Sequence, residues 1–161
     1  MFFWFIGAGW LLVAAVFQSP ALDYRLVMLG ALLPLLDVLT GGPWMLHTLL
    51  ASVFALAAVM VLTAPRRLDH RRLVRRRWLG IPIGMFVHLV LDGAWTNTGV
   101  FWWPAFGTSF GHARLPELDR GALSLLMELA GLAASAYGVN RYGLRDAEAR
   151  KRFLRTGQLP R

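Results

Sequence analysis

The sequence has no cysteine, so disulfide bonds and metal sites built on thiolates are excluded. It also has little charge: Asp, Glu, Lys and Arg make up 16% of the residues, whereas hydrophobic residues make up 57% and the mean hydropathy is +0.50. Soluble domains carry about 25% charged residues. The composition therefore favours an integral membrane protein over a soluble domain.

Basic residues are absent before the first apolar run, residues 2–18, and this absence argues against a cleaved signal peptide. A signal peptide begins with a basic region and ends at a small-residue cleavage site, whereas this run leads into Gln18-Ser19-Pro20. We therefore expect residues 2–18 to form a membrane-spanning helix, slightly shorter than the usual ~20 residues.

Four more apolar segments follow, and each is expected to span the membrane. Their ranges are 22–39, 44–64, 78–95 and 121–139. The sequence thus predicts an all-α, polytopic integral membrane protein, with a single transmembrane domain of five helices over residues 1–139 and a basic tail over residues 140–161. Between the last two spans lies an aromatic-rich segment that suits the headgroup level of a bilayer.

The basic residues are concentrated in three segments, which predicts the orientation in the membrane. Of the 17, seven lie within residues 65–77, seven lie in the tail, and one is Arg25. With five spans these segments share one side, and the positive-inside rule makes that side cytoplasmic. We expect a multi-pass protein of the cell (inner) membrane, with its N-terminus outside and its C-terminus in the cytoplasm.

The net charge of +8 would indicate nucleic acid binding if the basic residues formed one solvated face. They flank apolar runs instead, so no nucleic acid partner is expected. The Arg-rich segment, residues 65–77, is expected to contact anionic lipid.

His88 and Asp92 lie four residues apart inside an apolar run, so both side chains share one face of a helix, one turn apart. Burying such a pair is costly unless the two groups meet a partner, a water-filled cavity or a metal ion. The five-span topology brings three more polar residues to the outer half of the membrane: Asp37, His47 and Glu128. We expect these residues to form one site.

Two imidazoles with carboxylates make a mixed nitrogen and oxygen ligand set that suits Zn²⁺, and also Mn²⁺ or Fe²⁺. We expect Asp37, His47, His88 and Asp92 to bind such a divalent ion. A metal-bound water ionises near neutral pH and can act as a hydrolytic nucleophile. Glu128, together with Asp92, is then expected to be catalytic, by orienting or deprotonating the attacking water.

A non-enzymatic interpretation stays open. Hydrogen bonds between helices, or caps at the interface in the case of Asp37 and His47, explain each polar residue separately. Gly131 and Ser135 form a small-xxx-small pair suited to close helix packing, which is typical of a small membrane subunit that binds a larger membrane protein or a second copy of itself. A transporter or proton relay is disfavoured, because the helices show no obvious repeat.

The run His88-Leu-Val-Leu-Asp92, followed by Thr98-Gly-Val-Phe-Trp-Trp-Pro104, resembles the signature of the YdjM-like inner-membrane metal-dependent hydrolases. Upstream, Gly30-Ala-Leu-Leu-Pro-Leu-Leu-Asp37 and His47-Thr48 are similar to two further segments of that family. The resemblance covers roughly residues 27–107. It implies metal-binding or catalytic roles at Asp37, His47, His88 and Asp92.

The chain departs from the family's pattern in two places. Leu35 stands where the family usually has its first aspartate, and Trp44-Met45-Leu46 stands where an earlier His-Arg pair is usual. Either this is a divergent branch in which Glu128 and a water complete the coordination, or it is a member that kept the fold and lost the chemistry. The intact second half of the pattern favours the divergent branch.

The expected function is that of a membrane-embedded, metal-dependent hydrolase acting at the outer membrane interface on a lipid-linked ester, phosphoester or amide. Trp102 and Trp103 are expected to form a lipid-facing lip where an acyl chain enters.

Overall fold

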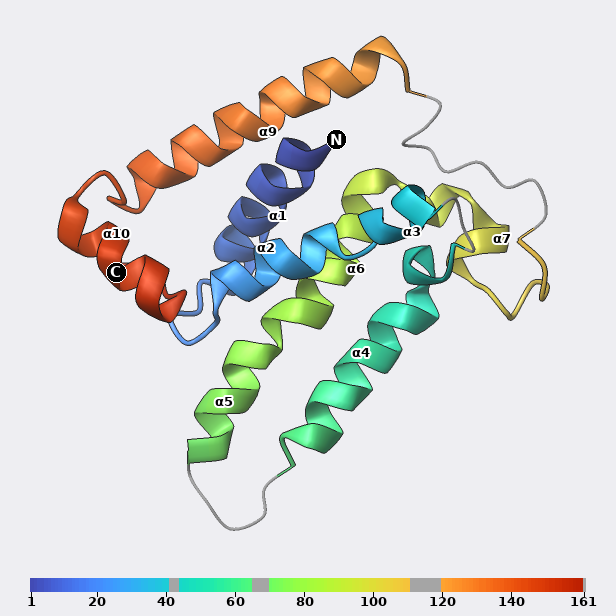
Figure 1. Ribbon diagram of the computed structural model, residues 1–161, viewed down its shortest axis with the longest axis horizontal. Coiled ribbons are helices and arrows are strands. Elements are labelled where there is room, and N and C mark those ends of the chain that lie inside the picture. Colours follow the sequence, from blue (N-terminus) through green and yellow to red (C-terminus); the bar gives the residue numbers. More distant parts are fainter. Residues whose placement is uncertain (41–43, 65–69, 111–119, 161) are drawn as a thin grey trace.

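The computed structural model describes residues 1–40, 44–64, 70–110 and 120–160, and every regular element within these ranges is a helix (Figure 1). The all-α fold class expected from the sequence is confirmed. In chain order the elements are α1 (Phe2–Phe17), α2 (Tyr24–Leu32), α3 (Leu35–Thr40), the 3-10 turn η1 (Met45–His47), α4 (Leu49–Leu62), α5 (His70–Trp78), α6 (Gly80–Asp92), the 3-10 turn η2 (Ala94–Thr96), α7 (Thr98–Phe101), α9 (Ala122–Arg141) and α10 (Ala147–Thr156).

The helix lengths differ from the expected spans. Among the helices of the described ranges, only α9, with 20 residues, is long and apolar enough to cross a membrane. α1 and α4 are also apolar but have 16 and 14 residues. The expected span over residues 22–39 is divided at Pro34, and the one over residues 78–95 is reduced to the 13 residues of α6. The prediction of five full-length spans is therefore not supported.

Pro34 divides the second expected span into α2 and α3. A proline inside a helix has no N–H to donate, and its ring collides with the carbonyl four positions earlier, here that of Gly30. The chain makes a tighter turn instead: the Leu33 N–H donates to the Gly30 carbonyl at 3.2 Å, and the Asp37 N–H donates to the Pro34 carbonyl at 3.0 Å. α3 is therefore a separate short helix with Asp37 in its first turn.

Pro82 lies in the first turn of α6 and sets the boundary between α5 and α6, at the beginning of the fourth expected span. Its nitrogen cannot donate to the Trp78 carbonyl, and this is where α5 ends. The Leu79 N–H still donates to the Arg75 carbonyl at 3.0 Å, so α6 begins after a single intervening residue. α6 ends where Gly93 takes a left-handed backbone, with φ 71°, and has 13 residues.

α2 lies against α6 with main chain close to main chain. A Cβ added to Gly30 would collide with the Ile81 carbonyl, and one added to Gly84 would collide with the Val27 carbonyl. Because both residues are glycines, the two helices approach closely. The approach brings the Ala31 carbonyl of α2 within hydrogen-bonding distance of a side chain on α6.

α9 lies along α1 in the same manner (Figure 1). A Cβ added to Gly131 would collide with the main chain of Phe3, and one added to Gly7 would collide with the Gly131 carbonyl. That Cβ on Gly7 would also lie 2.6 Å from the Ser135 hydroxyl. From the sequence, Gly131 and Ser135 were a possible contact with a separate membrane protein. In the structure they pack against α1 of the same chain.

The basic tail is packed onto the helical domain. Phe153 of α10 is buried in a cluster with Trp10 of α1 and Tyr24 of α2. The Tyr24 N–H also donates to the Gly157 carbonyl at 2.8 Å. The tail thus belongs to the same folded unit as the helices that precede it.

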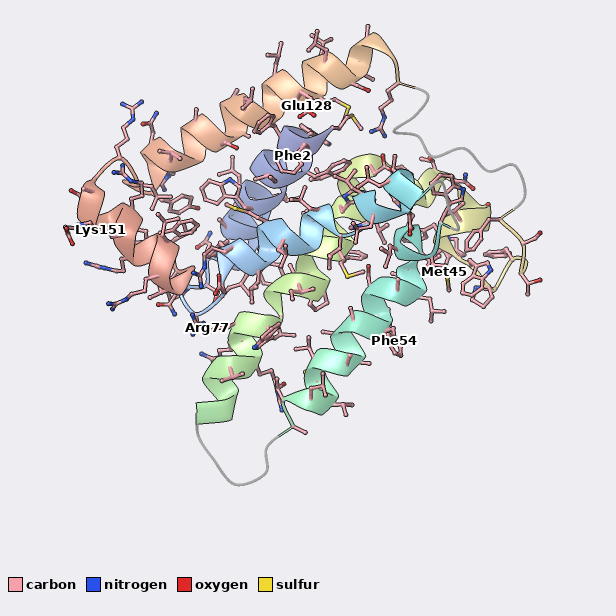
Figure 2. The ribbon with its side chains drawn as sticks, viewed as in Figure 1. Phe2, Met45, Phe54, Arg77, Glu128 and Lys151 are labelled. Carbon is pink, nitrogen blue, oxygen red and sulfur yellow. The ribbon has the colours of Figure 1, made fainter. Side chains whose placement is uncertain are left out.

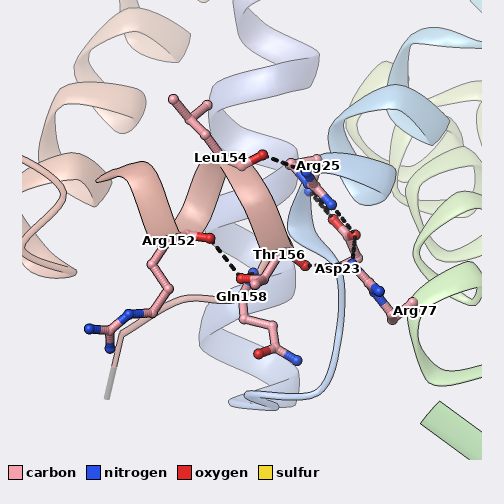
Figure 3. A network of polar contacts seen from close by, with 7 residues as sticks. All are labelled: Asp23, Arg25, Arg77, Arg152, Leu154, Thr156 and Gln158. Atoms are coloured by element: carbon pink, nitrogen blue, oxygen red, sulfur yellow. Dashed lines mark hydrogen bonds and ion pairs between the residues drawn. The ribbon is translucent and has the colours of Figure 1, made fainter. Parts of the chain in front are cut away.

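Asp23 joins the three basic segments (Figure 3). Its carboxylate is buried and accepts from the Arg25 guanidinium at 3.0 and 2.7 Å, and Arg77 Nη2 lies 3.6 Å from the same carboxylate. Arg25 and Arg77 also donate to the carbonyls of Leu154 and Thr156, at 2.6 and 3.2 Å. The three segments that the charge count placed on one side of the membrane therefore meet at one end of the molecule.

Candidate functional site

Two histidines from distant parts of the chain meet near the end of α6. His47 lies in η1 and His88 lies in α6, and neither ring has any exposed surface. Their ring centroids are 5.2 Å apart, with an angle of 75° between the ring planes. The convergence expected from the sequence is present for this pair, and we call it the histidine pair.

The Nδ1 atom of each imidazole faces an oxygen. His88 Nδ1 lies 2.7 Å from the Ala31 carbonyl oxygen, and His47 Nδ1 lies 3.1 Å from Asp37 Oδ2. A carbonyl oxygen only accepts, so Nδ1 of His88 carries the hydrogen and Nε2 has the lone pair in the neutral ring. A carboxylate favours the same tautomer in His47.

Asp37 holds both the imidazole of His47 and the backbone around it. Asp37 Oδ2 accepts from the backbone N–H groups of Leu46 and His47, at 2.7 and 3.2 Å, in addition to facing the ring. These contacts fix η1 against α3. Asp37 was expected to bind the metal directly, whereas the structure places it behind His47, where it orients the ring.

Phe5 of α1 supports the ring of His88. The two rings are stacked, with centroids 3.8 Å apart and planes inclined by 23°. Phe5 is fully buried, so the imidazole is confined on that face. α1 thereby contributes to the site through packing, a role that the sequence did not indicate because Phe5 is one apolar residue among many in its run.

Asp92 is buried one turn after His88 and is paired with a cation. Arg120 Nη1 lies 3.2 Å from Asp92 Oδ1, and Arg120 Nη2 donates to the Asp92 backbone carbonyl. Arg120 was not among the residues expected at this site. The sequence does contain a sign of this pairing: Arg120 is a basic residue that directly precedes the fifth expected span, on the opposite side of the membrane from the three basic segments.

Glu128 is placed at the start of α1 rather than at the histidine pair (Figure 2). Its carboxylate accepts from the backbone N–H groups of Phe2, Phe3 and Trp4, at 2.5, 2.6 and 3.3 Å. The first N–H groups of a helix have no acceptor within the helix, and a carboxylate there is favourable. Glu128 therefore caps α1 from α9, and its position does not support the expected role as catalytic base.

The aromatic segment packs against the same end of α6. Phe101 of α7 is buried in a cluster with Leu89 and Ala94. Trp102 remains 44% exposed, whereas Trp103 stacks on Phe110 with ring centroids 5.4 Å apart. The exposure of Trp102 suits the expected lipid-facing lip, whereas the ring of Trp103 packs on Phe110 of the same aromatic segment.

The fit of a metal ion to these residues is partial. Two imidazoles on one tetrahedral ion, with Zn–N bonds of about 2.0–2.1 Å, have ring centroids about 5 Å apart, which matches the histidine pair. Among the residues that the structure describes, no three His, Asp or Glu side chains are placed to hold one ion. The expected four-ligand centre is thus not assembled among the described residues: the separation of the two rings suits a shared ion, Asp37 lies behind the His47 ring, and Asp92 faces Arg120.

Comparisons of the chain with protein families, with curated proteins and with solved structures give no match. The similarity to the YdjM-like hydrolases therefore stays a resemblance of short motifs.

Proposed function

We propose that the chain is a membrane-embedded hydrolase in which the histidine pair is the catalytic centre, acting at the outer membrane interface on a lipid-linked ester, phosphoester or amide. One observation carries the proposal: two fully buried imidazoles from separate segments meet, and each has its Nδ1 held by an oxygen. Metal-binding and general-base histidines have their second nitrogen held in this manner.

Exposed apolar surface supports the membrane part of the proposal. Only Ser52 of α4 is buried, whereas Phe54, Val61 and Leu62 are 73%, 73% and 81% exposed. Figure 2 shows Phe54 pointing away from the other helices. A helix that is apolar on all sides and exposed is suited to lipid.

The proposed topology uses five segments: α1, α2 with α3, α4, α6 and α9. The basic segments around Asp23 lie at one end and the histidine pair at the other, in keeping with a cytoplasmic C-terminus and an outward site. A reporter fused at residue 161 is expected to report the cytoplasm, and one inserted near Ser109 the outer side. A cytoplasmic signal near Ser109 would contradict this orientation.

In this proposal each residue at the site has a specific role. Asp37 fixes the orientation of the His47 ring, and the Ala31 carbonyl does the same for the His88 ring. Nε2 of each ring is then the nitrogen that takes a proton or binds a cation. A divalent ion held by His47 and His88, Zn²⁺ or alternatively Mn²⁺ or Fe²⁺, would supply a Lewis acid and a water that ionises near neutral pH.

The proposal is tested by metal content and hydrolysis in the same preparations. Protein purified in mild detergent and loaded with Zn²⁺ is expected to hold about one ion per chain and to lose it in His47→Gln and His88→Gln. Glu148→Gln, an exposed change on α10, is the control and should retain the ion. Hydrolysis of a phospholipid panel, followed by mass spectrometry, should be lost in the same two variants. Equal metal content in all four proteins, with no hydrolysis, would contradict the proposal.

The alternative is a non-enzymatic subunit that packs against a larger membrane protein. Its support in the sequence came from Gly131 and Ser135, and these residues pack against α1 within the chain. The exposed face of α4 is the surface that such a partner would cover. This alternative would be favoured if the chain were recovered from membranes in a stable complex whose formation depended on α4.

A further inference from the structure

A pocket of about 840 Å³ lies beside α10, at the end of the molecule opposite to the histidine pair, and we call it the tyrosine pocket (Figure 1). Its walls come from the C-terminal ends of α1 and α9, the first turns of α2 and α10, and residues 159–160. Ligand pockets have volumes of about 300–1,000 Å³. The tyrosine pocket therefore has room for a small molecule or a lipid head group.

All three tyrosines of the chain line this pocket, together with one arginine. They are Tyr24 at the start of α2, Tyr137 in α9 and Tyr142 directly after α9. Arg141, the last residue of α9, supplies a positive charge. Among the residues that the structure describes, no Asp or Glu lines the pocket. The charge of the pocket is thus positive, which favours an anionic ligand.

The backbone carbonyls at the two helix ends already accept hydrogen bonds from the chain itself. Gln18 closes α1: its backbone N–H donates to the Ala14 carbonyl at 3.1 Å, and its Nε2 donates to the Ala15 carbonyl at 3.3 Å. At the end of α9, the Tyr142 N–H donates to the Gly138 carbonyl at 3.0 Å. Carbonyls at a helix C-terminus repel anions while they lack such partners. These hydrogen bonds reduce that repulsion.

The hydrogen-bond donors of the pocket are in surplus. The hydroxyl of Tyr24, a residue that is 1% exposed, donates to the Ser19 carbonyl at 3.1 Å. The Arg141 guanidinium and the hydroxyls of Tyr137 and Tyr142 have no acceptor within the described ranges. A guanidinium offers five N–H donors and each phenol offers one O–H donor. The pocket therefore suits a ligand that brings several acceptor oxygens.

A phosphate group matches these donors better than a carboxylate does. A carboxylate is planar and is held by a single guanidinium fork, whereas a phosphate has three strong acceptor oxygens that point in different directions. It can therefore accept from an arginine and from hydroxyls at the same time. The remaining lining is largely apolar and includes Leu11, Ala15 and Leu159. A ligand that fills the pocket thus has an aliphatic part beside its anionic group.

We propose that the tyrosine pocket binds the phosphate group of a ligand with an aliphatic part, and that Arg141 pairs with this phosphate. A phospholipid head group and a soluble phosphate ester share this chemistry, and the experiment below separates them. The site lies far from the histidine pair, so its occupation does not depend on the proposed hydrolysis.

The tail forms one wall of the tyrosine pocket, and this gives the proposal a second readout. Residues 159–160 follow α10 and face the pocket together with α1 and α9. A bound ligand therefore joins the tail to the helical domain. A ligand that binds only the attached form stabilises this form by mass action. Limited proteolysis of α10 should slow several-fold when the pocket is filled.

The first arm of the experiment uses the full-length chain in a mild non-ionic detergent. Butyl phosphate is the probe and butanol is the phosphate-free comparison, and binding is measured by calorimetry. Arg141→Gln is expected to weaken binding of butyl phosphate at least tenfold, the effect of losing charge-assisted hydrogen bonds. Arg152→Gln is the matched control: it removes the same charge from an exposed position on α10 outside the pocket, and should leave the affinity unchanged.

The second arm measures lipid retention by native mass spectrometry, with phosphatidylglycerol as the probe and dioleoylglycerol as the phosphate-free lipid. Retention of phosphatidylglycerol that is lost in Arg141→Gln and kept in Arg152→Gln would support the proposal and assign the phosphate to a lipid head group. Binding of butyl phosphate without retained phosphatidylglycerol would support it and assign a soluble ester.

Two neighbouring residues of α1 provide a test that leaves the charge unchanged. Ala15→Trp places a large ring in the pocket wall and should abolish binding and the protection of α10, whereas Val16→Trp, at a position that is 68% exposed and outside this pocket, should leave both intact. Equal affinity in Arg141→Gln and Arg152→Gln would overturn the proposal. So would binding that is insensitive to Ala15→Trp, or absence of binding in both arms.

Discussion

Arg120 holds Asp92 at two points, its carboxylate and its backbone carbonyl, at the end of the helix that carries His88. The pair links the beginning of α9 to the end of α6. It also opposes a metal ion at Asp92, because a cation already occupies the neighbourhood of the carboxylate.

Asp92→Asn distinguishes an ion pair from a metal ligand. If pairing with Arg120 is the main role, the variant leaves a largely buried guanidinium without its carboxylate, and the free energy of unfolding should fall by about 1–3 kcal/mol, the cost of a poorly satisfied buried donor. Metal content should then be unchanged. Thermal unfolding in detergent and elemental analysis are measured together.

Arg120→Gln and the double variant complete a thermodynamic cycle for this pair. The double variant should be more stable than the sum of the two single changes predicts. Loss of the metal in Asp92→Asn with full stability would show instead that Asp92 binds the ion and that Arg120 moves aside.

Asp37→Asn tests the orientation of His47. The amide oxygen can still accept from the Leu46 N–H, so the fold should be retained, but the charge that holds the ring is gone. Residues that orient a metal-binding histidine contribute about 10–100-fold in affinity or activity. We expect a loss of that size in Zn²⁺ affinity, measured by competition with a chelating dye.

Asp37→Ala is the companion variant, because it removes the acceptor of the backbone N–H groups as well and should also lower the thermal stability. Unchanged Zn²⁺ affinity in Asp37→Asn would mean that Asp37 has only a structural role.

Gly157→Ala should detach α10. Gly157 has φ 72°, and a Cβ there would collide with the Asp23 carboxylate. Gly143 is a matched control, since it has φ 63° but no atom within 4 Å of an added Cβ. Gly143→Ala should cost about 1 kcal/mol for backbone strain, and Gly157→Ala clearly more. Limited proteolysis of α10 is the measurement, and equal protection of the two variants would contradict the predicted collision.

The attachment of α10 should also depend on pH. Burial raises the pKa of the Asp23 carboxyl, but hydrogen bonds and charge from Arg25 outweigh this effect and hold the pKa below its usual range. A carboxyl with a lowered pKa in the folded state contributes stability above its unfolded pKa, about 3.9, and this stability is lost as the pH falls through the lower folded value.

Proteolysis of α10 should therefore be constant between pH 7 and pH 5 and increase below about pH 4. Asp23→Asn should be more sensitive to proteolysis at neutral pH and show little further change on acidification. An increase in wild-type cleavage already between pH 7 and pH 5 would indicate that another group controls the attachment.

The sequence predicted those features that depend on hydrophobic patterning and on the side of the membrane where each connecting segment is expected. The helical class is one, and the approach of His47 to His88 is another. The meeting of Arg25, Arg77 and the tail at one end also follows from counting the apolar segments between them. These features need no knowledge of how individual helices pack.

The features that were missed depend on tertiary contacts. Pro34 divides one expected span and Gly93 ends α6 before the end of another, and apolar composition alone does not show where a helix breaks or ends. Glu128 caps α1 only because α9 lies along α1. Arg120 reaches Asp92 only because the beginning of α9 is close to the end of α6.

The glycine contact between α2 and α6 has a chemical consequence. Gly84 lies one turn before His88, and Gly30 precedes the residue whose carbonyl receives the His88 hydrogen. The distance between two backbones thereby decides which nitrogen of a buried ring is protonated. A single methyl group at Gly84 would move the Ala31 carbonyl away from His88, and the hydrogen would no longer be held on Nδ1. The reactivity of Nε2 would then change although no atom of the imidazole is altered.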